Sequence, residues 1–379
     1  MARPLEGVRS MKILCEREKL REALAVTTSV IPSKSTRPAV ENVSMIATGD
    51  ALELIGTDLD VAIRYRIEDV KTDEPGSVLV PARVAADFVR DLPAANGATV
   101  TMRTHGDNFI IESGEDSCEL STIDPDEYPD VASFDEADSV PVMAATFTRL
   151  VSRTGFAAAR EAGRYAMHGI LTQCENDELK LVATDGRRLA IASAALEADG
   201  VGPLQAIVPP KGMHLFCKVL DDPTERVRLQ FGDSQFCLKT SKAEVFARLI
   251  DGEFPRYDAV VPASTENRMD ADTATLTQKL KLVANVTSPD TRAVRMSLDK
   301  GQLTIFGRSL STGEATAHMN VEFEGSPGMI SFNPDYLLDG LKNCEGDTVC
   351  LEFNDKASPG KFTLGENYVY VVMPITVDI

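Results

Sequence analysis

The sequence predicts an α+β fold that is repeated three times along a chain of 379 residues. Strand-like segments of one pattern, with spacings of 127 and 124 residues, begin at Leu52, Leu179 and Leu303. Dipeptides that precede helix-like segments, with spacings of 128 and 124 residues, begin at Val80, Val208 and Phe332. Because two independent landmarks share one period, and the period is far longer than a solenoid repeat, a whole domain occurs in three copies.

Each copy is expected to contain a hairpin and two helices. Alternating β-branched residues bracket short polar turns at residues 48–50, 175–177 and 299–301. The first helix of each copy is expected to begin near Glu16, Thr146 and Thr275, with the two threonines as N-caps. The second helix of each copy is expected to follow the dipeptide that begins at Val80, Val208 or Phe332. Since strands outnumber helices, each copy should hold two helices packed on antiparallel sheet.

The repeat predicts three domains of ordinary size, at residues 11–137, 138–266 and 267–379, each able to bury a core. Residues 1–10 are expected to be a loose extension, since they lack the apolar core of a signal peptide. Apolar runs elsewhere are far too short to cross a membrane. The chain is therefore expected to be a fully folded protein with no membrane partner.

Cysteine usage bears on compartment and on metal binding. The seven cysteines are odd in number and scattered, with no Cys-x-x-Cys pair and no histidine at metal-ligand spacing. They predict reduced, mostly buried thiols in a cytoplasmic protein. Neither a metal site nor a cofactor is expected.

The motifs of common enzymes are absent from the sequence. There is no phosphate-binding loop, no dinucleotide fingerprint and no nucleophile elbow. Asp58 and Asp185 recur at equivalent places in two copies, which indicates turn capping and not catalysis. A hydrolase or transferase, the alternative of a different class, needs an unsuspected site among Asp185, Arg188 and His168.

Charge is distributed unevenly along the chain. The net charge is −19, but the six helical segments together carry +6, which leaves −25 for the rest. If all helices face one way, one mildly basic surface would make weak, salt-sensitive and sequence-independent phosphate contacts. The alternative is that amphipathic helices simply carry Lys and Arg on solvated faces.

Five segments carry a specific resemblance to a known family, and together they extend from the first copy to the C-terminus. They read Gly56-Thr-Asp-Leu-Asp-Val61, Val80-Pro-Ala-Arg83, Ala183-Thr-Asp-Gly-Arg-Arg-Leu-Ala190, Asp251-Gly-Glu-Phe-Pro-Arg-Tyr257 and Tyr370-Val-Val-Met-Pro-Ile375. They resemble the bacterial DNA polymerase III beta subunit, the replicative sliding clamp. The resemblance implies a head-to-tail homodimer whose six clamp domains close a ring around duplex DNA.

The resemblance also implies which residues face DNA. These are Lys34, Arg37, Arg83, Arg160, Arg164, Lys211, Asn333 and Tyr336. The chain departs from the family pattern at Pro210, Ala166 and Glu161, so the strength of the DNA contact made by the middle domain stays open.

A hydrophobic peptide pocket between the middle and last domains is the second implied site. Its residues are Met167, Thr184, Gly186, Arg187, Arg188, Leu189, Pro255, Val260, Val371, Val372, Met373, Pro374 and Ile375. An aliphatic slot with an adaptable methionine suits several related peptides, and Arg187 or Arg188 can meet an acidic group at its edge. The alternative is that residues 371–374 are only a last strand that ends in core.

The implied partners are the alpha-type subunit of the replicative polymerase, the clamp loader, and other polymerases and repair proteins that carry clamp-binding peptides. At the implied dimer seam, Cys118, Asn285 and Val286 stand where larger apolar side chains are expected, so the dimer should open more easily. The leading prediction is a non-catalytic processivity clamp. The second is an acidic three-domain scaffold that binds peptides without encircling DNA.

Overall fold

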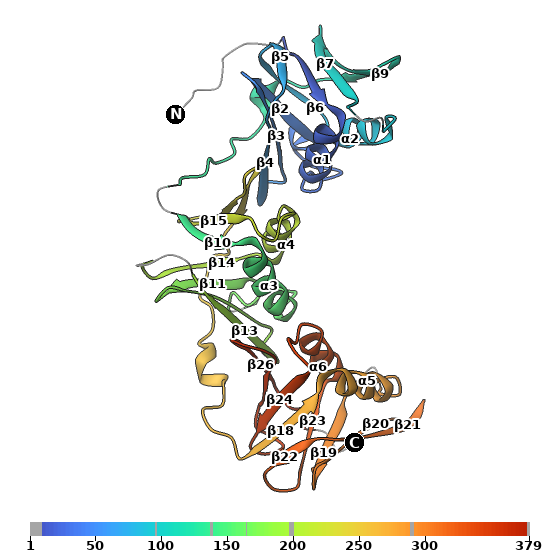
Figure 1. The fold of residues 1–379 in the computed structure, drawn as a ribbon, viewed down its shortest axis with the longest axis vertical. Coiled ribbons are helices and arrows are strands. Elements are labelled where there is room, and N and C mark those ends of the chain that lie inside the picture. Colours follow the sequence, from blue (N-terminus) through green and yellow to red (C-terminus); the bar gives the residue numbers. More distant parts are fainter. Residues whose placement is uncertain are drawn as a thin grey trace. The chain divides into compact units, whose positions relative to one another are not determined.

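The computed structural model describes residues 10–94, 97–136, 139–163, 165–196, 201–288 and 292–376. It forms two compact units, each coloured by sequence in Figure 1. Unit 1 comprises Met1–Ala145 and Lys211–Leu249, and unit 2 comprises Thr146–Pro210 and Ile250–Ile379. All but one residue of the expected extension at residues 1–10 lies outside the described residues.

Unit 1 is built on two antiparallel sheets. Its strands are β1 (Lys12–Glu16), β2 (Asn42–Thr48), β3 (Ala51–Thr57), β4 (Val61–Ile67), β5 (Lys71–Glu74), β6 (Gly76–Pro81), β7 (Thr99–His105), β8 (Asn108–Ser113), β9 (Asp116–Ser121), β10 (Ser139–Met143), β15 (Arg226–Phe231), β16 (Gln235–Lys239) and β17 (Ala243–Arg248). One sheet has the order β5-β1-β7-β8-β9, and the other has the order β10-β15-β16-β17-β4-β3-β2-β6.

The helices of unit 1 cover these sheets. They are α1 (Arg17–Thr28), α2 (Ala82–Asp91), α4 (Pro210–Lys218, all but its first residue) and the short 3₁₀ helices η1 (Pro38–Glu41) and η2 (Pro125–Glu127). α1 and α2 pack side by side, and α1 also contacts β3 and β4 (Figure 1). Their buried faces carry Leu20, Leu24 and Val89, none of which is exposed, so amphipathic periodicity determines which face packs.

Unit 2 repeats this architecture. Its strands are β11 (Ile170–Glu175), β12 (Glu178–Thr184), β13 (Arg188–Ala195), β14 (Leu204–Val208), β18 (Asn267–Asp272), β19 (Val294–Asp299), β20 (Gln302–Ser309), β21 (Gly313–Asn320), β22 (Glu322–Glu324), β23 (Gly328–Phe332), β24 (Thr348–Phe353), β25 (Gly360–Thr363) and β26 (Tyr368–Val372). The strand orders are β14-β11-β12-β13-β26-β25-β24-β18-β22 and β21-β20-β19-β23.

The helices of unit 2 are also placed on its sheets. They are α3 (Ala144–Thr154, all but its first two residues), α5 (Thr273–Ala284), α6 (Pro334–Leu341) and the 3₁₀ helices η3 (Gly155–Ala157) and η4 (Tyr257–Val260). α5 and α6 pack together, and α6 also contacts β26 (Figure 1). With antiparallel pairing in both units, the α+β class expected from the sequence is confirmed.

The three predicted hairpins are present at the predicted places. β2–β3, β11–β12 and β19–β20 are antiparallel pairs joined by two-residue turns. The repeated leucines at positions 52, 179 and 303 are completely buried at the start of the second strand of each pair. Gly49, Asn176 and Gly301 adopt positive φ in the turns, a conformation that Gly and Asn tolerate best.

The N-cap predictions are wrong for both threonines. α5 begins at Thr273, and the Asp272 side chain caps it by accepting a hydrogen bond of 2.7 Å from the Thr275 N–H. α3 begins at Ala144, so Thr146 lies inside its first turn. An aspartate is the better cap in α5, because its negative charge also favours the positive end of the helix dipole.

Continuous sheets explain why the chain forms two units. In unit 1, β4 from the first predicted domain pairs with β17 from the middle one. In unit 2, β13 from the middle domain pairs with β26 from the last. The middle repeat is therefore divided between two sheets. The domain boundaries at 137/138 and 266/267 stay predictions; residues 137 and 138 lie outside the described residues, and residue 267 is the first of β18.

Candidate functional site

A groove in unit 2 brings together most of the residues predicted for the peptide pocket. We call it the unit-2 groove, and it encloses about 450 Å³, including solvent at its mouth. Its lining comes from the segment before β11, the turn between β12 and β13 with the start of β13, the segment around η4, and the end of β26. The lining residues are Met167, Thr184, Gly186, Arg188, Leu189, Pro255, Arg256, Tyr257, Val260, Val371 and Met373.

The floor of the unit-2 groove is part of a hydrophobic core. Leu189 and Val371 lie opposite each other in the β13–β26 pair, and both are almost fully buried. They pack with Leu171 and Val182 in one cluster. Removing such aliphatic groups from water contributes about 25 cal/mol per Å² of apolar surface, so the floor is firmly held before any ligand arrives.

The rim of the groove is exposed apolar surface. Val260 is 40% exposed and Met373 is 38% exposed, whereas the preceding Val372 is completely buried. Val371 and Val372 are thus core positions of β26, as expected for a last strand, while Met373 lies beyond the strand on the exposed rim of the groove. An exposed methionine beside a valine suits a surface that accepts more than one apolar side chain.

Four of the thirteen predicted pocket residues do not line the groove, namely Arg187, Val372, Pro374 and Ile375. Val372 faces the opposite side of the sheet from Val371, as the two-residue period of a strand requires. Two lining residues, Arg256 and Tyr257, were missing from the prediction, although both belong to the segment 251–257 that carried the resemblance. Tyr257 packs against the core cluster and its hydroxyl group contacts Gln173 Oε1 at 3.1 Å.

Local hydrogen bonds shape the turn that forms one wall of the groove. Asp185 Oδ1 accepts from the N–H groups of Arg187 and Arg188 at 2.9 and 3.0 Å, and Gly186 has a φ of 83°. The first repeat has the same arrangement, in which Asp58 Oδ1 accepts from two backbone N–H groups. The prediction that both aspartates cap turns is confirmed.

The Arg188 side chain is fixed by contacts with other residues of unit 2. Its guanidinium donates to Asp185 at 3.1 Å, to Asp339 at 2.5 Å and to the Phe156 carbonyl at 2.7 Å, and it lies 4.6 Å from the ring centre of Tyr336. Burial would lower the pKa of Arg188, but the hydrogen bond to Asp339 and the neighbouring negative charge raise it further than burial lowers it. Arg188 therefore stabilises the wall, and exposed Arg187 and lining Arg256 are the cations better placed for a ligand.

The candidate DNA-facing residues lie on helices and on the segments beside them. In unit 1, Lys34 and Arg37 flank η1, Arg83 is on α2 and Lys211 is on α4, and all four are exposed. Lys211 forms an ion pair with Asp58. In unit 2, Arg160 is exposed; Arg164 lies outside the described residues.

Asn333 and Tyr336 are engaged within unit 2. The Asn333 side chain caps α6 by accepting from the Asp335 N–H at 2.9 Å, and the ring of Tyr336 lies against Arg188. Both side chains are only partly exposed. Capping and stacking explain these residue types at these positions, independently of any contact with DNA.

The structure shows where the three residues that depart from the family pattern lie. Pro210 is the first residue of α4, where its missing N–H costs nothing. Ala166 is buried and its N–H donates to the Glu253 carbonyl at 3.1 Å, so the chain has a small core residue at that point. Glu161 is exposed and adds a negative charge next to Arg160.

Each unit also has a smaller sheet with edge strands, of order β5-β1-β7-β8-β9 in unit 1 and β21-β20-β19-β23 in unit 2. Cys118 lies on β9, at the edge of the five-stranded sheet of unit 1. In unit 2, Asn285 and Val286 follow the end of α5, and the Val286 carbonyl accepts from Thr312 Oγ1 at 2.8 Å. An unpaired edge offers backbone donors and acceptors to a second chain.

The described residues hold no cluster of His, Cys, Asp and Glu that could bind a metal ion. The seven cysteines all lie among the described residues and form no disulfide, and burial raises the pKa of Cys15, Cys174 and Cys237 to about 12. The expectation of mostly buried thiols agrees with this, since four of the seven are buried. Within the described part of the chain, no helix is long and apolar enough to cross a membrane.

The chain is similar to known proteins over almost its whole length. Models of the N-terminal, central and C-terminal domains of the DNA polymerase III beta subunit match residues 11–132, 141–256 and 258–376. The beta sliding clamp of Pseudomonas putida is 30% identical over 367 residues, which cover 96% of this chain and 100% of that protein. The beta sliding clamp of Vibrio cholerae is 31% identical over 370 residues, with the same coverage.

Solved structures agree with the sequence relatives. A Pseudomonas aeruginosa sliding clamp bound to griselimycin, 28% identical, superposes with a TM-score of 0.92 over 97% of this chain and 100% of that chain. Three α+β clamp domains define a sliding clamp, a class of protein that works by binding and not by catalysis. This chain belongs to the DNA polymerase III beta subunit family. The predicted family and function are confirmed, and the scaffold and hydrolase alternatives are not favoured.

The contacts of Arg188 predict a stability difference between two neighbouring arginines. Arg188→Lys removes the planar guanidinium that joins two carboxylates, a carbonyl and a ring, so we expect a loss of about 2 kcal/mol in the free energy of unfolding. Arg187→Lys, at the exposed neighbour, should change it by less than about 0.5 kcal/mol. Urea denaturation of both variants measures the difference, and equal effects would contradict the structural role of Arg188.

Proposed function

We propose that two copies of this chain form a head-to-tail ring around duplex DNA and that the unit-2 groove holds a short peptide of the replicative polymerase. The observation that carries the proposal is the groove itself, where eleven residues from four separate segments meet on an apolar floor. The polymerase is then tethered to DNA by a ring that has no catalytic task. Replication takes place in the cytoplasm of bacteria, which is where we propose that this chain acts.

The groove suits short linear peptides of mainly apolar character. Leu189, Val371 and Met373 provide aliphatic and thioether surface, and Arg256 adds a positive charge at the side. A peptide with one or two large apolar side chains and an acidic or polar residue matches this arrangement. The same groove would serve the clamp loader and repair proteins in turn, since only one peptide fits at a time.

Retention on DNA would depend on topology more than on affinity. Lys34, Arg37 and Arg83 are exposed and close to helices, so they can make phosphate contacts that carry no sequence information. Because leaving a closed ring requires opening an interface, weak contacts are sufficient. Weak contacts also let the ring slide.

The proposed seam pairs the five-stranded sheet of unit 1 in one copy with the four-stranded sheet of unit 2 in another. Strand pairing between edges would supply backbone hydrogen bonds, while Cys118 and Asn285 supply little apolar surface. The seam is therefore proposed to be weaker than one with large apolar side chains at these positions.

A first prediction concerns the exposed methionine at the groove. Met373→Asp puts a charge on the apolar rim, so we expect it to weaken binding of a polymerase-derived clamp-binding peptide about thirtyfold, the loss of ~2 kcal/mol that is typical of a key interface residue. Met329→Asp is the matched control, since Met329 is also exposed in unit 2 but lies outside the groove. Calorimetry measures both affinities, and equal losses would argue against the groove.

Deleting residues 373–379 tests the same groove more severely. We expect peptide binding to be lost while sedimentation still shows a dimer. A deletion variant that fails to fold would show that the tail is part of the core, and the point variant would then decide the question.

A second prediction concerns DNA. With clamp loader and ATP, the wild-type ring should stay on nicked circular DNA until the circle is cut. Arg37→Glu combined with Arg83→Glu should lower the loaded amount about tenfold, because it replaces two phosphate contacts with repulsion. Peptide binding should not change. The control, Lys300→Glu with Lys356→Glu, makes the same charge change on two exposed turns. The proposal that Arg37 and Arg83 face DNA would be overturned if the control lost ring retention, or if the Arg37 and Arg83 variant kept it.

A third prediction concerns the seam. We expect sedimentation at nanomolar concentration to show monomer in exchange with dimer. Cys118→Leu with Asn285→Ile should shift the equilibrium toward dimer by adding apolar surface. A wild-type dimer that persists undiminished at nanomolar concentration would show that the seam is stronger than proposed.

A further inference from the structure

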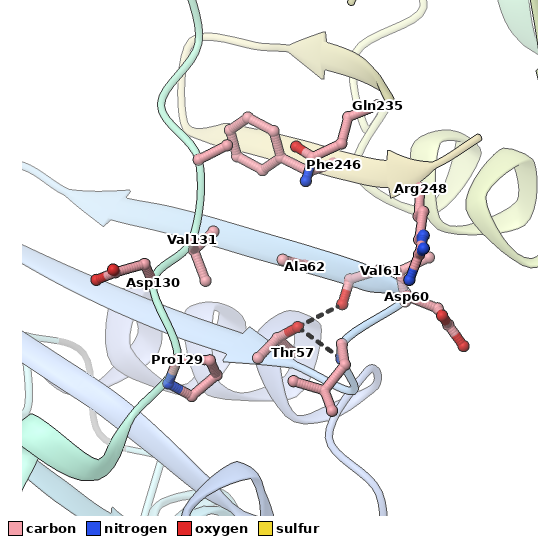
Figure 2. A pocket seen from close by; sticks show the side chains of 12 residues that line it. Thr57, Asp60, Val61, Ala62, Pro129, Asp130, Val131, Gln235, Phe246 and Arg248 are labelled. Carbon is pink, nitrogen blue, oxygen red and sulfur yellow. Dashed lines mark hydrogen bonds between the residues drawn. The ribbon is translucent and has the colours of Figure 1, made fainter. Parts of the chain in front are cut away.

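A second groove lies in unit 1, and Figure 2 shows its lining from close by. We call it the unit-1 groove. It encloses about 400 Å³, including solvent at its mouth, and is formed by residues 57–62, residues 129–132 and the strands β16 and β17. Its size is similar to the 450 Å³ of the unit-2 groove.

The two grooves are equivalent positions of the internal repeat. In the unit-1 groove Ala62 pairs with Phe246 across β4 and β17, and in the unit-2 groove Leu189 pairs with Val371 across β13 and β26. The spacings of these pairs are 127 and 125 residues, which match the repeat. The turns agree as well. Thr57 Oγ1 donates to the Val61 carbonyl at 2.8 Å, and Thr184 Oγ1 donates to the Arg188 carbonyl at 2.7 Å.

The unit-1 groove also has an apolar floor. Phe246 is 2% exposed and Ala62 is 8% exposed, and they form a buried cluster with Cys237. Val131, which lines the groove, packs against this cluster. Figure 2 shows Val131 and Ala62 together in the middle of the groove, with Phe246 nearby. More of the accessible lining is polar here than in the unit-2 groove, so an apolar side chain of a ligand would contact the apolar surface that Val131 and Leu59 leave exposed.

The charges of the two grooves are opposite at equivalent positions. Asp60 occupies the repeat position of Arg187, and Asp130 occupies that of Arg256. Both aspartates are exposed at the rim. The segment 122–136 that supplies Asp130 contains six Asp and Glu residues and neither Lys nor Arg. Arg248 is the one cation that lines the groove within the described part of the chain, so the lining is negative on balance.

Leu59 is an unusual residue for its place. It has a φ of 83°, the same value as its counterpart Gly186, although a leucine is strained in this left-handed region and a glycine is not. Its side chain is 53% exposed at the groove, so burial within unit 1 compensates little for that strain. An exposed apolar side chain kept in a costly conformation is well placed to contact a ligand.

We propose that the unit-1 groove is a second docking site, which binds a short peptide with an apolar residue flanked by Lys or Arg. The kind of ligand rests on the peptide role proposed for the unit-2 groove, and the charge preference rests on Asp60 and Asp130. The apolar residue packs on Phe246, Val131 and Leu59. Because the two grooves have opposite charges, one clamp holds two classes of partner at once.

The test uses two labelled peptides, Lys-Leu-Ala-Leu-Phe-Lys and Glu-Leu-Ala-Leu-Phe-Glu, and the full chain. Fluorescence anisotropy at low salt should show saturable binding of the basic peptide. Asp60→Arg with Asp130→Arg should weaken that binding about tenfold, since two rim charges are reversed. The matched control, Arg187→Asp with Arg256→Asp, changes the equivalent positions of the other groove and should not weaken it.

Leu59→Gly gives a readout that a purely structural role would not produce. The glycine relieves the strain, so the melting temperature should rise while affinity for the basic peptide falls. Three results would each overturn the proposal. The wild-type chain could show no saturable binding of the basic peptide, the Asp60→Arg and Asp130→Arg double variant could bind it as tightly as the wild type, or Leu59→Gly could leave its affinity unchanged. If the polymerase-derived peptide still binds in those cases, only the second site fails and the proposed function stands.

Discussion

Strand pairing between repeats is the interaction on which the other features of this clamp depend. The β4–β17 and β13–β26 pairs join sheets from successive repeats, so neither edge is left with unsatisfied backbone groups. Both grooves lie at the ends of these pairs, where the turn before β4 or β13 meets the segment that leads to the next repeat. The pairing thus creates the place for a ligand, and the side chains at its end decide which ligand is accepted.

Symmetry of the backbone is combined with asymmetry of the side chains. The turns at Asp58 and Asp185 use the same hydrogen bonds, but Val61 stands in one repeat where Arg188 stands in the other. Arg188 links the turn to Asp339 on α6 through a strong, charge-assisted contact. At this pair of positions the copies differ in side chain while strand register and turn geometry stay the same. Such differences give a repeated fold sites of different chemistry.

Much of this architecture could be predicted from the sequence because its signals are local. Alternating residues and polar turns gave the three hairpins, and the dipeptide landmarks gave the second helices. Nine groove residues were predicted from the resemblance, and seven of them lie in the segments that carry it. Arg256 and Tyr257 were missed although Pro255 beside them was predicted, because the sequence of an irregular segment does not show which of its side chains face a groove. The shared sheets were missed because pairing of β4 with β17 has no signature in either strand. The contacts of Arg188 with Asp339 and Phe156 were not predicted because these partners are distant in sequence.

The divided middle repeat also constrains the order in which the chain can fold. β4 pairs early with β3, but its second neighbour β17 is complete only after residue 248 has been synthesised. β13 likewise pairs with β12, and its second neighbour β26 is complete only after residue 372. Contacts so distant in sequence form slowly, and the waiting strands present open edges that favour aggregation. Neither unit can be completed by a single repeat, so the chain should leave the ribosome as two late-closing folding units. Prompt engagement by chaperones during translation would then matter more for this clamp than for a chain of three self-contained domains.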